Sequence, residues 1–103
     1  MATTTKIHVS SVDNELYILA TQKNLSTELF HAKAGAGHLV DCVITPDWIL
    51  PPGAYTLILI GINWGGHQHF KVTLTTGGVD TIHTAPASTV VGANWTIAIP
   101  ITV

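Results

Sequence analysis

The chain has 103 residues, a length that suits one domain and leaves no room for two. Charged residues make up only 10% of it, against about 25% in ordinary soluble domains, while apolar residues make up 47%. A formal net charge of −2 with four Lys and Arg residues excludes the basic surface that binds nucleic acid or an anionic membrane.

Residues 1–5 are polar and predict a disordered tail, so the expected single domain covers residues 6–103. The tail does not resemble a signal peptide, and no run approaches the roughly 18 apolar residues of a membrane span. The single Cys42 cannot form an internal disulfide, as is usual in a reducing compartment. We therefore expect a cytoplasmic protein without disulfides, for which release by a non-classical route stays open.

The first part of the chain has the alternation of β-strands. Residues 6–12 alternate apolar and polar side chains, and residues 15–22 resume as a second strand after the turn-forming pair Asp13-Asn14. We therefore predict a hairpin between these two strands. Residues 25–33 predict a third short strand, with a turn and a half of helix as the alternative.

Residues 38–45 form a compact apolar segment, which predicts a strand with Val40, Cys42 and Ile44 facing the core. The prolines that follow this segment break the chain. They predict a connection that carries Trp48 across one end of the domain.

The most prominent stretch is residues 54–76, in which two strand-forming runs flank Gly65-Gly66. A Gly-Gly pair suits a two-residue hairpin turn because both of its central positions need positive φ. We therefore predict a long hairpin. Its inner side would carry five apolar core residues, Leu57, Leu59, Phe70, Val72 and Leu74. Its outer side would carry a mixed row, Ile58, Ile60, Ile62, Trp64, His67, His69, Lys71 and Thr73.

Gly77-Gly78 predicts a second turn, after which residues 79–84 return along this hairpin. The pattern leaves two pairing registers for this strand, which differ by a shift of one residue. In one register His83 faces the core, and in the other it lies on the outer side with the two histidines of the hairpin.

Residues 94–103 predict the last strand, and Pro100 favours an edge position for it because proline cannot donate to a ladder. Short strands at close intervals, separated by turn signals, predict an all-β, single-domain antiparallel β-sandwich. A small β-barrel is the alternative.

His67-Gln68-His69 gives the strongest chemical signal, because residues two apart on a strand point the same way and can present two imidazoles to one metal ion. Five residues separate Gly61 from His67. Together with His69, this spacing resembles the start of the first cupin motif, which would imply a metal-dependent enzyme. The glutamate that continues this motif is missing, and a third ligand would have to be His83. We rank a role for His67 and His69 as half-exposed polar neighbours of Trp64 and Ile62 above a role as metal ligands. We therefore expect no metal and no cofactor.

The tryptophans are better candidates for binding. Trp48 lies in a predicted loop, Trp64 at a predicted hairpin tip and Trp95 at a strand start. Exposed aromatic rings hold neutral sugars by stacking on their C–H faces, while neighbouring amides read the hydroxyls. The candidate ligand-binding residues are Trp64, Asn63, His67, Gln68, His69 and Trp48. The alternative is that each indole plugs an end of the sandwich or a subunit contact.

We therefore expect a non-enzymatic, lectin-like carbohydrate-binding module that acts as a homo-oligomer, with further copies of itself and neutral glycans as partners. A self-assembling structural protein, whose apolar face stacks subunits, ranks second. The cupin-like, metal-dependent enzyme ranks third.

Overall fold

The computed structural model describes residues 2–35 and 40–103. Its elements are β1 (Thr4–Gln22), β2 (Leu25–Ala34), β3 (Cys42–Ile44), the 3-10 helix η1 (Pro46–Trp48), β4 (Ala54–Asn63), β5 (His69–Thr76), β6 (Val79–Thr84) and β7 (Gly92–Thr102). The strands pair antiparallel, which confirms the predicted all-β fold. In the part of the chain that the structure describes, no helix is long and apolar enough to cross a bilayer.

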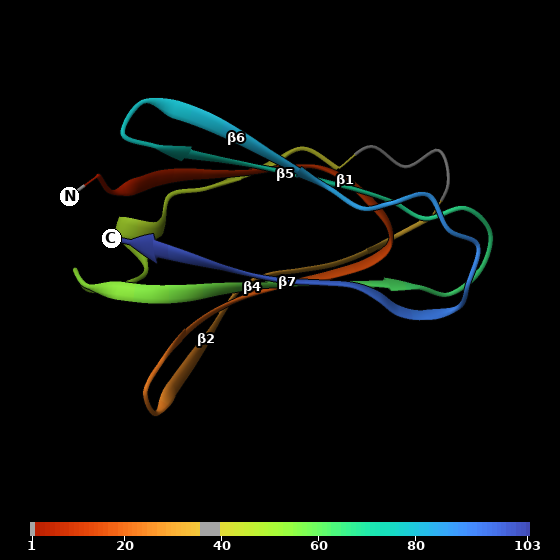
Figure 1. The fold of residues 1–103 in the computed structure, drawn as a ribbon, viewed down its shortest axis with the longest axis horizontal. Coiled ribbons are helices and arrows are strands. Elements are labelled where there is room, and N and C mark those ends of the chain that lie inside the picture. The colour runs from red at the N-terminus through yellow and green to blue at the C-terminus, as the bar shows by residue number, and fades with distance from the viewer. Residues whose placement is uncertain (1, 36–39) are drawn as a thin grey trace.

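Two layers of strands share β1. Its first part pairs with β3 and β5, and β6 continues this layer, which we call sheet A. Its last part pairs with β2 and β4, and β7 continues this second layer, sheet B. In Figure 1, β5 and β6 lie in the upper layer and β4 and β7 in the lower one, and β1 crosses between the layers at the right-hand end. The molecule is therefore a sandwich made by curling one antiparallel sheet.

The predicted hairpin over residues 54–76 is wrong, because β1 lies between β4 and β5 in the strand order. The core residues predicted for it are nevertheless correct. They are each at most 3% exposed: Leu57 and Leu59 of β4, and Phe70, Val72 and Leu74 of β5. Alternation indicates which side chains face inward, but two strands in facing layers show the same pattern as two neighbouring strands.

The predicted hairpin over residues 6–22 is wrong as well, because β1 is continuous. A register shift between Val9 and Ser11 marks a β-bulge, and one extra residue reverses the alternation, so Val9 and Leu16 both face the core. Asp13 is the last residue paired with β5, and Asn14 is the first paired with β2. The predicted turn is therefore the point at which β1 passes from sheet A to sheet B.

The strands predicted over residues 25–33, 79–84 and 94–103 are confirmed, whereas the one predicted over residues 38–45 is present only as the three-residue β3 (Cys42–Ile44). Residues 25–33 lie in a strand, β2, and not in a helix. β5 and β6 form a hairpin around Gly77 and Gly78, whose φ values are 58° and 77°. β7 is at an edge of the sheet, as Pro100 indicates. Ile44 of β3 faces inward, with Val40 and Cys42 packed against the core, while residues 38 and 39 lie outside the described residues. β1 begins at Thr4, two residues before the predicted start of the domain.

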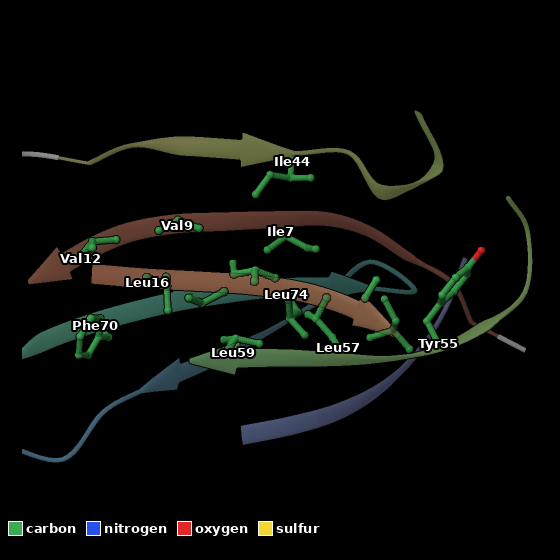
Figure 2. Close-up of a cluster of buried hydrophobic side chains, with 14 of the residues drawn as sticks. Ile7, Val9, Val12, Leu16, Ile44, Tyr55, Leu57, Leu59, Phe70 and Leu74 are labelled. Carbon is green, nitrogen blue, oxygen red and sulfur yellow. The ribbon is translucent and has the colours of Figure 1, made fainter. Parts of the chain in front are cut away.

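Buried side chains from both layers fill the space between them (Figure 2). The largest fully buried apolar side chains are Phe70, Ile7, Leu16, Ile18, Leu57, Leu59, Val9 and Val72. Full burial of such a side chain contributes roughly 1.5–3 kcal/mol, so this packing is the main source of stability.

Gly61 of β4 allows the ring of Phe70 to approach the backbone of the facing layer. A Cβ at Gly61 would lie 2.8 Å from Cε2 of Phe70, closer than carbon atoms pack. We expect Gly61→Ala to lower the free energy of unfolding by about 1–3 kcal/mol, measured by urea denaturation. Phe70→Leu should lower the free energy of unfolding less in the Gly61→Ala background than in wild type, because the clash disappears with the ring. Losses that simply add in the double variant would contradict this explanation.

Candidate functional site

Trp64 directly follows β4, and its side chain is exposed and fixed in position. The residue is 57% exposed. Its indole Nε1 donates to Glu15 Oε1 at 2.9 Å, and its backbone N–H donates to Asn14 Oδ1 at 2.7 Å. Both acceptors belong to β1, immediately after it enters sheet B. An exposed indole is therefore held in one orientation by a central strand.

Glu15 lies at the Nε1 edge of this ring and is almost completely covered, with 7% of its side chain exposed. Its Oε2 lies 2.6 Å from His31 Nε2 and accepts a hydrogen bond from the Tyr17 hydroxyl at 3.3 Å. The hydrogen bonds from His31 and Trp64 hold the pKa of Glu15 below its ordinary value of 4.5. Burial, together with the Glu15 carboxylate, raises the pKa of the Tyr17 hydroxyl, so this group stays a donor.

His31 is itself oriented by packing. It lies opposite Tyr17 in the register of β2 on β1, and the two rings stack with their centroids 4.0 Å apart. The stack and the hydrogen bond to Glu15 together fix the carboxylate. Trp64 therefore rests on a rigid support that spans two strands of sheet B.

A pocket of about 370 Å³ opens beside the indole, lined by Asn14, Lys33, Ala34, Gly35 and Trp64. Lys33 Nζ lies 5.8 Å from the centroid of the Trp64 ring, within cation–π range. The pocket thus offers an aromatic face, an amide and an ammonium group. This combination suits a small polar ligand that also has a C–H face.

Asn63, a predicted ligand residue, is fully buried. Its Nδ2 donates to the carbonyls of Gly66 and Val90 at 3.0 and 3.1 Å, and its Oδ1 accepts from the Gly65 N–H at 3.2 Å. These bonds join the loop after Trp64 to the loop before β7. Asn63 therefore positions the loop that carries Trp64, and its polar atoms are used within the fold.

Gln68, another predicted ligand residue, is 6% exposed. Its Nε2 donates to the Pro86 carbonyl at 2.7 Å, its Oε1 accepts from Asn94 Nδ2 at 3.3 Å, and its backbone N–H donates to the Ser88 carbonyl at 3.0 Å. Gln68 thus also joins the loop after Trp64 to the loop before β7.

We expect Asn63→Ala to lower the free energy of unfolding by about 1–3 kcal/mol, because the carbonyls of Gly66 and Val90 lose their buried donor. Urea denaturation measures the change. The matched control is Asn24→Ala in the exposed turn between β1 and β2, which should stay within about 0.5 kcal/mol of wild type. Equal losses in both variants would contradict the role given to Asn63.

The histidines His67, His69 and His83 do not gather as a three-ligand site. His69 is exposed at the start of β5, where it pairs with Asp13, and His67 is exposed in the preceding loop. His83 pairs with the buried Val72 and therefore faces the core side of sheet A, opposite to His69. Within residues 2–35 and 40–103, no three His, Cys, Asp or Glu side chains gather as a metal site.

The other two tryptophans lie elsewhere. Trp48 is 85% exposed in η1, which precedes β4, whereas Trp64 follows this ten-residue strand of about 30 Å. They therefore lie towards opposite ends of the sandwich. Trp95 is 5% exposed and stacks on Phe70 with the ring centroids 5.7 Å apart, so it belongs to the core.

A larger hollow of about 690 Å³ lies at the end where β1 begins and β7 ends. Three of its hydroxyl groups bond within the fold: Thr4 and Thr76 bond each other at 2.8 Å, and Tyr55 donates to the Pro51 carbonyl at 2.7 Å. Tyr55 is only 8% exposed. Because this hollow offers less free ring surface, the smaller pocket at Trp64 is the better candidate site.

The ionised Glu15 makes the support of Trp64 dependent on pH. Its pKa is lower in the folded protein than in the unfolded chain, so its contribution to stability is fully present above about pH 4.5 and is lost as pH falls through the folded pKa. We expect indole fluorescence to report loosening of Trp64 in that acidic range. Glu15→Gln should weaken this pH dependence; an unchanged profile would contradict it.

Sequence reasoning selected Trp64 but did not connect it with Glu15 or Lys33. The indole and Glu15 are 49 residues apart, and they meet because β1 pairs with β4. The alternation in β1 after the bulge does place Glu15 on the side opposite Leu16, but it does not indicate which strand lies beside it.

Comparisons with protein family models, with curated proteins and with solved structures found no match to this chain. The function is therefore inferred from the site itself.

Proposed function

We propose that this protein is a non-enzymatic, lectin-like module that binds neutral carbohydrate at the Trp64 pocket and acts as a homo-oligomer. One observation carries the proposal: an exposed indole lies at the wall of a pocket, fixed by its own hydrogen bond to Glu15 and by the bond of the Trp64 backbone N–H to Asn14. Sugars present apolar C–H faces and hydroxyls together. A rigid ring beside polar groups is complementary to both.

In the proposed complex, the Trp64 ring stacks on a sugar face and the Lys33 ammonium donates to hydroxyls. Asn14 contributes its amide: one N–H already bonds Asp13 Oδ1, and the other is left for the ligand. Asn63 and Gln68 hold the loops in place and do not touch the sugar. Because the ring is already oriented, little conformational entropy is lost when the ligand binds.

A single site of this kind binds weakly, since stacking contributes on the order of 1 kcal/mol beyond area burial. Several sites on one assembly raise avidity by roughly 10²–10⁴. Two features support a homo-oligomer: the chain has only 10% charged residues, and Ile58, Ile60 and Ile62 form a partly exposed row on sheet B. The half-buried free Cys42 agrees with a cytoplasmic location.

A glycan array probed with the labelled protein tests the proposal. We expect binding to a subset of neutral oligosaccharides, and we expect it to persist in EDTA because the proposed contacts need no metal ion. Lack of binding to every neutral glycan on the array would contradict the proposal.

A self-assembling structural protein is the second candidate. The observation that favours it is the same row of Ile58, Ile60 and Ile62, whose area a stacked subunit would cover. Under this alternative the protein assembles but binds no glycan, so the array distinguishes the two candidates.

A further inference from the structure

In the described part of the chain, four strands lie at sheet edges: β3 and β6 in sheet A, and β2 and β7 in sheet B. An open edge is a template for pairing with another chain, and proteins block it with short strands, proline, charged side chains or bulges. β3 has three residues, β7 carries Pro100, and β2 carries Glu28 and Lys33 and pairs across a register shift. These three edges are therefore protected.

β6 differs from them. Its sequence, VDTIHT, contains no proline, lysine or arginine, and its pairing with β5 runs without a register shift. The carboxylate of Asp80 accepts a hydrogen bond from Thr75 Oγ1 at 2.6 Å. Val79 and Ile82 are 65% and 59% exposed. The edge of β6 is thus regular and partly apolar.

The backbone groups that face this edge follow from the ladder. The Ala85 N–H donates to the Phe70 carbonyl, which continues the pairing of β6 with β5 by one residue. Hydrogen-bonded pairs alternate along an antiparallel strand, so the odd-numbered residues of β6 bond to β5. Asp80, Ile82 and Thr84 therefore direct their N–H and C=O groups away from the sheet.

We propose that β6 pairs antiparallel with β6 of a second copy of this chain, around a twofold axis at Ile82. In this register Ile82 faces its own counterpart, Asp80 faces Thr84 of the other copy, and Thr81 faces His83 of the other copy. All three outward-facing residues then gain backbone hydrogen-bond partners. The two sheet A layers join into one continuous sheet.

The composition of β6 favours its own copy as the partner. A twofold interface needs a self-complementary patch. In the proposed register the apolar Ile82 meets itself, the carboxylate of Asp80 meets the hydroxyl of Thr84, and no like charges face each other. The low charge of the chain adds little repulsion between copies. A strand of six residues makes a small interface, so we expect association at micromolar concentration.

This inference rests on the homo-oligomer part of the proposed function and not on carbohydrate binding. β6 is at an edge of sheet A, whereas Trp64 is held by β1 within sheet B. A β6-linked dimer therefore leaves both Trp64 pockets open, and the oligomer and the sugar site can be tested separately.

Ile82→Lys tests the interface, because at the twofold axis it places two like charges directly opposite each other. Light scattering of the wild-type protein at tens of micromolar should give twice the 10.9 kDa chain mass. Ile82→Lys should give the chain mass, with a dimer dissociation constant raised at least tenfold. The exposure of Ile82 makes a folded variant the expected result, and circular dichroism checks it. Leu25→Lys, which adds the same charge at a similarly exposed apolar residue of β2 in sheet B, should stay dimeric.

Amide hydrogen exchange locates the interface independently of the variants. The N–H groups of Asp80, Ile82 and Thr84 should be protected in concentrated wild type and should exchange rapidly on dilution. A wild-type monomer, a dimer that Ile82→Lys leaves intact, or a dimer in which these three amides exchange freely would each overturn the inference. The affinity of Ile82→Lys for a monovalent sugar tests the Trp64 site separately. Wild-type affinity in the monomeric variant would show that sugar binding does not depend on the β6 interface.

Discussion

Trp64→Ala is expected to remove detectable binding to a multivalent neutral glycan while leaving the oligomer and the fold intact. The variant loses the stacking surface and the apolar area that the ring buries, which together correspond to about 10- to 100-fold in affinity at each site. Because avidity multiplies the loss over several sites, a surface coated with glycan should show no residual binding. Surface plasmon resonance measures binding, and light scattering measures the oligomer.

Trp48→Ala is the matched control, since it removes an exposed indole at the other end of β4. It should retain wild-type binding. Trp64→Phe separates two contributions: it keeps an aromatic face but loses the hydrogen bond to Glu15, so binding should be weakened and not abolished. Unchanged binding in Trp64→Ala contradicts the proposed site, and loss of the oligomer in that variant would make Trp64 an interface residue and favour the structural protein.

Phe70→Ala is expected to lower the free energy of unfolding by about 3–5 kcal/mol, a large part of the roughly 5–15 kcal/mol that holds a typical domain together. Phe70 is 1% exposed, projects from β5 of sheet A, and stacks on Trp95 of β7 in sheet B. Removing its ring therefore leaves a cavity between the two layers. Thermal and urea denaturation measure the loss.

Phe30→Ala on β2 is the control, because Phe30 is only partly buried and packs at the margin of the core. Its expected loss is clearly smaller than that of Phe70→Ala. If the two variants are equally destabilised, the contact between Phe70 and Trp95 has no special role in joining the layers.

The sequence predicted the inward side chains well, because burial follows a two-residue period that can be read locally. It did not predict the strand neighbours. The bulge between Val9 and Ser11 has no strong sequence signal, and without it residues 6–22 resemble two short strands with a turn. Gly65-Gly66 resembles a hairpin turn, although the chain there passes from one layer to the other.

The candidate site was predicted only in part for the same reason. An exposed Trp64 follows from its place beside two glycines, which was visible in the sequence. Its supports, Glu15 and Lys33, come from strands whose pairing the sequence left undetermined. Asn63 and Gln68 were taken as ligand contacts because they are polar and close in sequence, yet their burial gives them a supporting role.

The shared strand β1 also determines how the protein can unfold. Sheet A is assembled from residues 4–13, 42–44 and 69–84, and sheet B from residues 14–34, 54–63 and 92–102, so the two layers alternate along the chain. No single cut yields one complete layer, and neither layer keeps a central strand if β1 is lost. Loosening one layer therefore loosens the other, which makes partial unfolding to a stable half-molecule unfavourable and a single cooperative transition the natural behaviour of this chain.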